Sequence, residues 1–357
     1  MRGVSSFVMR GHTGFADPLS RLAGVGLAAA LVIAPLASAL TTEVNVYSAR
    51  KEVLIKPLLD AFTAETGIAV NLVSGKADAL LQRLEREGAN SPADVLLTTD
   101  AGRLVRANQA GLLQATPTAT LSAAIPAQYR DPAGAWFGLS LRARPIMYSV
   151  DRVSPAELSS YAALAGPQWA GRVCVRSSNN IYNQSMLAAF IDHRGVAEAE
   201  AWAKGLVANF ARKPQGGDRD QIRAVAAGEC DVALANTYYL ARLATSDKEA
   251  DRTVAAQVAV FWPDQDGHGV HVNISGAGVT ASAGNVDNAI RLIEFLASDS
   301  AQKTYAEVVN EYPVKPGVPW SDVVATWGTF RADDLNLAVL GENNAEAVRI
   351  ADRAGWQ

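Results

Sequence analysis

The sequence predicts an α/β protein with two domains, and three observations support this prediction. Strand-like runs alternate with amphipathic helical segments between residues 44 and 111, in a βαβαβ order typical of a parallel sheet covered by helices. A second alternating set begins after an extended stretch from Trp136 to Tyr148. Removing a predicted leader of residues 1–39 from the 357-residue chain leaves 318 residues, which is more than one hydrophobic core usually serves.

The first set begins with residues 44–47, which alternate like a strand. The segment 51–66 then places its apolar residues at helical spacing. The next expected elements are a strand at 68–73, a helix around 80–84, a strand at 94–98 and a helix that Gly111 stops.

The second set is expected to contain short strands and longer helices. Gly195 is the predicted stop of its first helix. The expected strands are 172–175, 230–234 and 258–261, the expected helices are 183–194, 196–210 and 220–228, and a later helix is expected at 289–296.

Residues 1–39 have the features of a cleavable export signal. Three arginines give the stretch a positive balance, and an apolar run over 22–36 is shorter than the roughly 20 residues that span a bilayer. The run closes on a small-x-small pattern that ends at Ala39. We therefore expect cleavage after Ala39 and a soluble product in the periplasm.

Charge and motifs exclude several classes of function. The mature chain holds 29 basic and 35 acidic residues, a net charge of about −6, and no basic run offers a surface for nucleic acid. The sequence contains no GxSxG, P-loop or GxGxxG motif in a suitable context. We therefore expect a binding protein and not an enzyme.

The two cysteines, Cys174 and Cys230, both lie in strand-like runs of the mature chain. In an oxidising compartment they can pair, provided that the two strands are neighbours in one sheet. The alternative is that both are buried free thiols that pack as small apolar residues.

Polar residues follow several predicted strands, and tyrosines stand out among them. Tyr182 comes after the strand RVCVR, and Tyr238 and Tyr239 come after CDVALA. A phenol has a pKa near 10, so it is a poor ligand for most divalent metals, but a hard trivalent cation stabilises phenolate oxygen. The alternative is that these residues are ordinary aromatics at a strand end or helix start.

The chain resembles the ferric-ion-binding proteins of bacterial ABC importers, within the periplasmic binding protein superfamily. The segments that carry the resemblance are VNVYSARKEVLIKPLLDAF, SPADVLLTTDAGRL, GLSLRARPIMYS, GRVCVRSSNNIYNQS, GECDVALANTYYLARL and ISGAGV. The resemblance implies that Tyr182, Tyr238 and Tyr239 bind Fe(III). It also implies a monomer that docks on an inner-membrane permease.

The resemblance further implies a type II fold, in which two lobes with mainly parallel sheets enclose a ligand cleft. The N-terminal lobe is expected to comprise residues 40–142 plus about 276–320. The C-terminal lobe is expected to comprise residues 143–275 plus about 321–357.

The first strand departs from the family pattern. Some relatives have a histidine, a tyrosine or both just after this strand, where this chain has Arg50, Lys51 and Glu52. Others have a glutamate at the position of Thr99. Three tyrosines leave coordination positions open, so the resemblance implies a synergistic anion such as carbonate or bicarbonate. Arg50 and Arg142 are the candidates to hold it, because a guanidinium matches a planar carbonate. The alternative role for either arginine is a salt bridge, either on the surface or between the lobes.

Other residues and solutes complete the set of alternatives. Tyr47 ends the first strand, and we expect it to pack in the protein interior and not to bind a metal. His268 and His271 are expected to be structural, because no HExxH arrangement surrounds them. The same fold could also bind another small solute, such as an oxyanion, a polyamine or thiamine.

Overall fold

Two β-sheets organise residues 42–357, the part of the chain that the computed structural model describes. The predicted leader, residues 1–39, lies outside the described residues. Helices pack around both sheets, so the predicted α/β class is confirmed. Among residues 42–357, no helix has the length and the apolar character needed to cross a membrane.

The first sheet has five strands in the order β2-β1-β3-β9-β4, and we call it and its helices the first lobe. The strands are β1 (Glu43–Ser48), β2 (Ala69–Ser74), β3 (Val95–Thr99), β4 (Phe137–Ala143) and β9 (Val272–Val279). β1 pairs in parallel with β2 and β3, whereas β9 runs antiparallel to β3 and β4. The sheet is therefore mixed and not mainly parallel, because β9 enters it from the opposite end.

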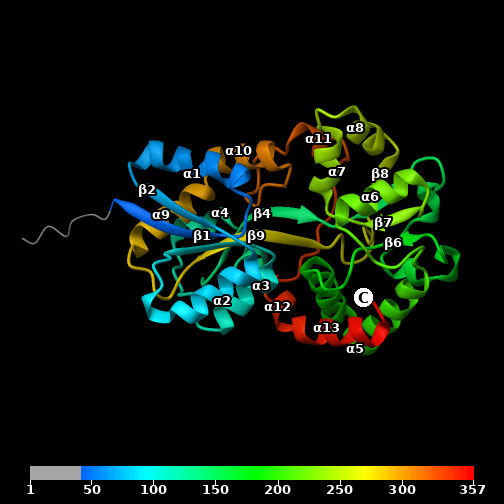
Figure 1. The fold of residues 1–357 in the computed structure, drawn as a ribbon, viewed down its shortest axis with the longest axis horizontal. Coiled ribbons are helices and arrows are strands. Elements are labelled where there is room, and N and C mark those ends of the chain that lie inside the picture. The colour runs from blue at the N-terminus through cyan, green and yellow to red at the C-terminus, as the bar shows by residue number, and fades with distance from the viewer. Residues whose placement is uncertain (1–41) are drawn as a thin grey trace, which may run out of the picture. The chain divides into compact units, whose positions relative to one another are not determined.

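Helices cover both faces of the first sheet. They are α1 (Glu52–Thr66), α2 (Ala77–Glu87), α3 (Ala101–Gln109), α4 (Ala119–Ala124), α9 (Val286–Leu296) and α10 (Asp299–Val309). In Figure 1, α1 and α10 lie on one side of the sheet and α2 and α3 on the other. α1 buries Ile55, Leu58, Leu59 and Phe62, which share one face at the helical period and so fix the helix against the sheet.

The second sheet has four shorter strands in the order β6-β7-β5-β8, and we call it and its helices the second lobe. The strands are β5 (Ile146–Ser149), β6 (Val173–Cys174), β7 (Val232–Leu234) and β8 (Val258–Phe261). β6 runs parallel to β7, and β5 runs antiparallel to β7 and β8. This sheet is also mixed.

The helices of the second lobe are α5 (Ile181–Ala208), α6 (Asp218–Ala227), α7 (Thr237–Ala244), α8 (Glu249–Ala256), α11 (Asp322–Ala325), α12 (Val339–Glu342) and α13 (Asn344–Ala354). The predicted tyrosines lie in the first turns of α5 and α7. Gly195 breaks α5 at φ 79°, a backbone conformation that glycine adopts without a Cβ clash, so the segment bends at the predicted stop. Single 3-10 turns lie at Gly88–Asn90, Ala127–Tyr129, Pro155–Glu157, Ala162–Ala165 and Pro167–Trp169.

The chain crosses between the sheets several times. Residues 144–145 join β4 to β5, and the segment between β8 and β9 leads back. The return was expected near residue 276, but β9 already pairs with β4 from Val272, opposite Ala143, so the crossing precedes Val272. A last segment leads from α10 to α11, which packs on α7, and α12 contacts both α3 and α5.

Candidate functional site

A polar cleft of about 430 Å³ lies where loops of both lobes meet. Arg50, Thr99 and Glu311 line it from the first lobe. The second-lobe side contains all three predicted tyrosines together with charged residues. These lining residues include Arg176, Tyr182, Asp218, Arg219, Arg223, Tyr238, Tyr239 and Arg242. The structure therefore brings residues from widely separated sequence segments to one cavity.

Tyr182 is placed by the start of α5. The loop after β6 ends at Asn180, whose side-chain oxygen accepts a hydrogen bond of 3.0 Å from the backbone N–H of Tyr182. This cap satisfies an N–H group that has no partner within the helix and fixes where the helix begins. Tyr182 consequently projects from the first turn of α5.

Tyr238 and Tyr239 lie in the first turn of α7, just after β7. Neighbouring residues on a strand point to opposite faces, but successive residues on a helix are only about 100° apart. The two ring centroids are 4.2 Å apart. The helical turn therefore lets both tyrosines line the same cleft.

The hydroxyl groups of Tyr182 and Tyr238 are in contact across the two helix starts. Their oxygens are 3.3 Å apart, and either one can donate the hydrogen bond. The N-terminal ends of both helices carry partial positive charge, which favours negative charge on nearby oxygens. The arrangement therefore suits a cation that converts phenols into phenolates.

The phenols of Tyr238 and Tyr239 are protonated at neutral pH in the metal-free protein, because burial raises the pKa of both. The pKa of Tyr239 is raised to about 12, first by burial and then by the neighbouring Tyr182 and Asp218. Burial also holds the pKa of Tyr238 well above its ordinary value, and Tyr182 contributes in the same direction. Only a strong positive charge close to the oxygens would favour the ionised forms.

Arg50 lines the first-lobe side of the cleft and forms an ion pair. Its Nη1 lies 3.0 Å from Glu311 Oε1 and 2.6 Å from Ser275 Oγ. Its Nε and Nη2 have no hydrogen-bond acceptor among residues 42–357. The guanidinium is therefore only partly satisfied by the first lobe.

Arg142 lies behind the tyrosines. The residue is 1% exposed, its Nη2 donates to the backbone oxygen of Ile274, and its Cζ is 5.4 Å from the ring centroid of Tyr182. Within the described part of the chain, its Nε and Nη1 find no acceptor. The two predicted anion-binding arginines therefore occupy different environments.

Sequence reasoning missed several charged residues of the site, among them Arg176, Arg242 and Glu311. Arg176 and Arg242 place their Cζ atoms 5.6 Å and 5.1 Å from the rings of Tyr182 and Tyr238, respectively. Glu311 is 1% exposed. Burial raises the pKa of its carboxyl group, but Arg50 and Arg142 lower this pKa by more, so the net shift is downward and the carboxylate is ionised. Arg176 follows a strand end and could have been suspected, whereas the irregular segment around Glu311 gave no signal.

Tyr47 and the histidines lie in other environments. The hydroxyl of Tyr47 donates to Glu87 at 3.0 Å. His268 stacks on His193 with centroids 3.8 Å apart, and burial, followed by the charge of Arg144, lowers the pKa of His271 to about 3. Residues 42–357 contain no group of three or more His, Cys, Asp or Glu side chains arranged for a metal ion.

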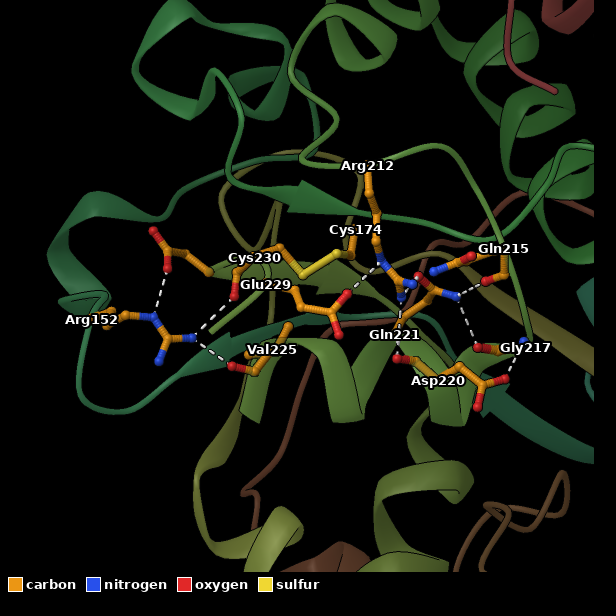
Figure 2. Close-up of a disulfide and its surroundings, with 11 residues drawn as sticks. Arg152, Cys174, Arg212, Gln215, Gly217, Asp220, Gln221, Val225, Glu229 and Cys230 are labelled. Carbon is orange, nitrogen blue, oxygen red and sulfur yellow. Dashed lines mark hydrogen bonds and ion pairs between the residues drawn. A yellow bond between two sulfur atoms is a disulfide. The ribbon is translucent and has the colours of Figure 1, made fainter. Parts of the chain in front are cut away.

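Cys174 and Cys230 form a disulfide in the structure. Cys174 ends β6 and Cys230 precedes β7, and these two strands are paired in the second sheet. Figure 2 shows the bond beside Arg152, which donates to the backbone oxygens of Val225 and Cys230. The disulfide therefore links the two strands after which the tyrosine-bearing helices begin.

Comparisons with known proteins give a consistent picture. A family model described as "Bacterial extracellular solute-binding protein" matches residues 58–332. The chain is 50% identical to iron uptake protein A1 of Synechocystis sp., over 88% of each chain. It is 30% identical to the major ferric iron-binding protein of Neisseria meningitidis serogroup B, over 93% of this chain and 97% of the relative.

A solved relative adds a structural match. The Trichodesmium protein IdiA (FutA), whose structure is described as a complex with iron and citrate ligands, is 51% identical to this chain. Its TM-score is 0.86, and the match covers 88% of this chain and 100% of the solved chain.

Proposed function

Because the chain belongs to the family of bacterial extracellular solute-binding proteins, we propose that it is the solute-binding component of an ABC importer with Fe(III) as its solute. The two-lobed type II periplasmic binding protein fold expected from the sequence is confirmed by the solved relatives. Tyr182, Tyr238 and Tyr239 are the proposed ligands.

The observation that carries this proposal is the convergence of three tyrosines on one side of the cleft. Two of their hydroxyl oxygens are only 3.3 Å apart, and all three line the same cavity. Three phenolates neutralise the charge of a trivalent ion, which reduces the electrostatic cost of burying that ion. The relatives named for iron uptake and ferric iron binding support the same ion.

A synergistic anion is the second part of the proposal. Three oxygen ligands leave positions open on an ion that is commonly six-coordinate, and carbonate or bicarbonate fits a site rich in guanidinium groups. Arg50 has N–H groups without an acceptor among residues 42–357 and lines the cleft, which supports its role. Arg142 also has N–H groups without an acceptor among residues 42–357, but it lies outside the cleft lining, 5.4 Å from the ring centroid of Tyr182.

The arginine-rich lining also favours a second candidate function, the binding of a small oxyanion without iron. Arg50, Arg176 and Arg242 line the cleft, and positive charge is what an oxyanion site requires. The same lining argues against a polyamine, which is cationic. A titration with Fe(III) distinguishes the two candidates.

In the proposed function, the protein is exported to the periplasm, acts as a monomer and delivers its iron to a membrane permease. Acidic conditions would favour release, because protons compete with the metal for phenolate oxygen. Reduction would also favour release, because Fe(II) is a softer cation with a lower charge.

The experiment that tests the ligand set is a titration of purified mature protein with Fe(III). Phenolate-to-iron charge transfer should colour the wild-type protein, and changing Tyr182, Tyr238 and Tyr239 to Phe should remove the colour. Tyr148→Phe is a matched control, because Tyr148 lies in β5 of the same lobe outside the cleft lining. A wild-type protein that stays colourless at saturating Fe(III) would falsify the iron proposal.

The anion is tested by repeating the titration with and without bicarbonate. We expect tighter binding with bicarbonate in the wild-type protein and a smaller gain in Arg50→Ala and Arg142→Ala. An equal affinity in both buffers would exclude the anion, and a full bicarbonate effect in either variant would remove that arginine from the proposal.

A further inference from the structure

Arg144 is a buried cation that sequence reasoning did not single out. It lies between β4 and β5, at the point where the chain passes from the first sheet to the second, and it is 1% exposed. A buried guanidinium is stable only when charged and polar partners surround it. Its partners therefore indicate what the position requires.

The guanidinium of Arg144 contacts the starts of both tyrosine-bearing helices. Nη2 donates to Asn183 Oδ1 at 2.7 Å, and Asn183 directly follows Tyr182 in α5. Nη1 donates to Asn236 Oδ1 at 3.1 Å, and Asn236 is the N-cap residue of α7. One side chain therefore links the two turns that present the tyrosines.

Asp218 balances the charge of Arg144 and strengthens the same link. Its Oδ2 lies 2.9 Å from Arg144 Nη1 and accepts the backbone N–H of Asn236, also at 2.9 Å. Its Oδ1 lies 3.2 Å from Nη1 of Arg176, which lines the cleft beside Tyr182. Both carboxylate oxygens are thus used to fix groups around the tyrosines.

The backbone of Arg144 is held at the crossing between the sheets. Its N–H donates to the backbone oxygen of His271 at 3.0 Å, and its own oxygen accepts from the hydroxyl of Tyr161 at 2.8 Å. His271 immediately precedes β9, the strand that returns to the first sheet. The residue therefore joins two crossing segments to the base of the tyrosine site.

We propose that Arg144 is a positioning residue for iron capture, which holds Tyr182 at a fixed distance from Tyr238 and ties that distance to the crossing segments. This inference rests on the proposed function of the tyrosines. The planar guanidinium is essential to it, because a lysine ammonium carries the same charge but cannot direct parallel N–H groups toward both asparagines.

The test compares Arg144→Lys with Arg152→Lys in purified mature protein. Arg152 is the matched control, because it pairs with Asp231 at 2.8 Å in the same lobe and lies outside the cleft lining. Both variants keep their charge, and thermal unfolding of the metal-free proteins records any purely structural cost. We expect Arg144→Lys to lower Fe(III) affinity by about 10- to 100-fold and to shift the charge-transfer band, as loss of a group that orients metal ligands does. Arg152→Lys should keep the wild-type affinity and band.

Asn183→Ala provides a second test that leaves the buried Arg144–Asp218 pair intact, so it retains folding if Arg144→Lys does not. It removes the Arg144 contact to α5, together with the hydrogen bonds that Asn183 Nδ2 donates to the backbone oxygens of Arg176 and Ser177. We expect a weaker loss of affinity with the same direction of band shift. A crystal structure of either metal-free variant should show the oxygens of Tyr182 and Tyr238 farther apart than 3.3 Å.

The outcomes separate this inference from the proposed function. Wild-type affinity and band in folded Arg144→Lys, or an unchanged distance between the tyrosine oxygens, overturn the positioning role while iron binding stands. A wild-type protein that binds no iron overturns the proposed function. In that case, the distance between the hydroxyl oxygens of Tyr182 and Tyr238 in crystals of the metal-free variants still decides whether Arg144 positions the tyrosines.

Discussion

The two sides of the cleft contribute different chemistry. The second-lobe side presents Tyr182, Tyr238 and Tyr239 at two helix starts, and burial raises the pKa of Tyr238 and Tyr239. The first-lobe side presents Arg50 and Glu311, which are already paired with each other at 3.0 Å. One side is therefore prepared to receive a cation, and the other has largely neutralised its own charges.

This difference assigns separate tasks to the two lobes. All proposed protein ligands lie on the second lobe, so the proposed function predicts that this lobe binds the metal alone. The first lobe can then contribute closure and the guanidinium of Arg50, whose Nε and Nη2 remain available for an anion. Removing a proposed ligand, an ion pair or a helix cap should therefore affect the two sides of the cleft differently.

The largest predicted effect is on the pH dependence of iron affinity. Forming a metal-bound phenolate from a phenol releases one proton, so binding of iron by three tyrosines releases three protons. Burial raises the pKa of Tyr238 and Tyr239, which strengthens this competition by protons. Affinity should therefore fall by about a thousandfold for each pH unit decrease around neutral pH. Competition with a chelator in bicarbonate-free buffer, corrected for protonation of the chelator, measures the slope. A hundredfold change per unit would mean that one tyrosine is not an ionised ligand.

The second prediction concerns the buried pair of the first lobe. Glu311→Gln removes the charge that balances Arg50, and loss of one partner from a buried pair destabilises folding by about 3–5 kcal/mol. Urea unfolding of the metal-free protein measures this. Asp60→Asn is the control, because its pair with Lys56 is exposed and should contribute only about 0–1 kcal/mol. Iron colour should persist in Glu311→Gln, and its loss would show that the first lobe supplies a metal ligand.

The same pair gives a pH dependence of stability with a defined sign. The pKa of Glu311 in the folded protein lies below its ordinary value of 4.5. Its contribution to stability is therefore complete above pH 4.5 and is lost as the pH falls through the folded pKa. Glu311→Gln should lack this part of the acid-induced loss of stability.

The sequence predicted the elements well where their signals are local. The helix expected at 51–66 is α1, and the strand expected at 258–261 is β8. Strand direction was harder, because β9 is buried along its whole length and carries no alternating pattern. Its antiparallel pairing depends on where the chain crosses between the lobes, which no local signal in the sequence encodes.

The site shows the same limit. The three tyrosines could be proposed because each lies in a short motif of consecutive residues, NIYNQS or NTYYLARL. The contacts of Arg144 could not, because its partners Asp218 and Asn236 lie far along the chain. Arg142 and Arg144 are two residues apart in the run RAR, and only the structure shows that one lies behind Tyr182 while the other links both helix starts.

The third prediction tests the disulfide of the tyrosine-bearing lobe. The bond closes a long loop, with a sequence separation of 56 residues, between two of the short strands of the second sheet. Changing both Cys174 and Cys230 to Ala should lower stability by about 2–4 kcal/mol. The first-lobe sheet has longer strands, so unfolding should become less cooperative and begin in the second lobe. Hydrogen exchange resolved by segment measures this, and equal loss of protection in both lobes would contradict it.

The smallest predicted effect compares one helix cap in each lobe. Asn180 caps α5 next to Tyr182, and Ser298 caps α10 in the first lobe by accepting from the backbone N–H of Ala301. Changing either residue to Ala should cost about 1 kcal/mol of stability. Only Asn180→Ala disorders a ligand-bearing turn, so it alone should weaken iron binding, by about fivefold if the full cost is transferred to binding. Equal iron affinities in the two variants would mean that Tyr182 is held by the Arg144 contact to Asn183 and not by the cap.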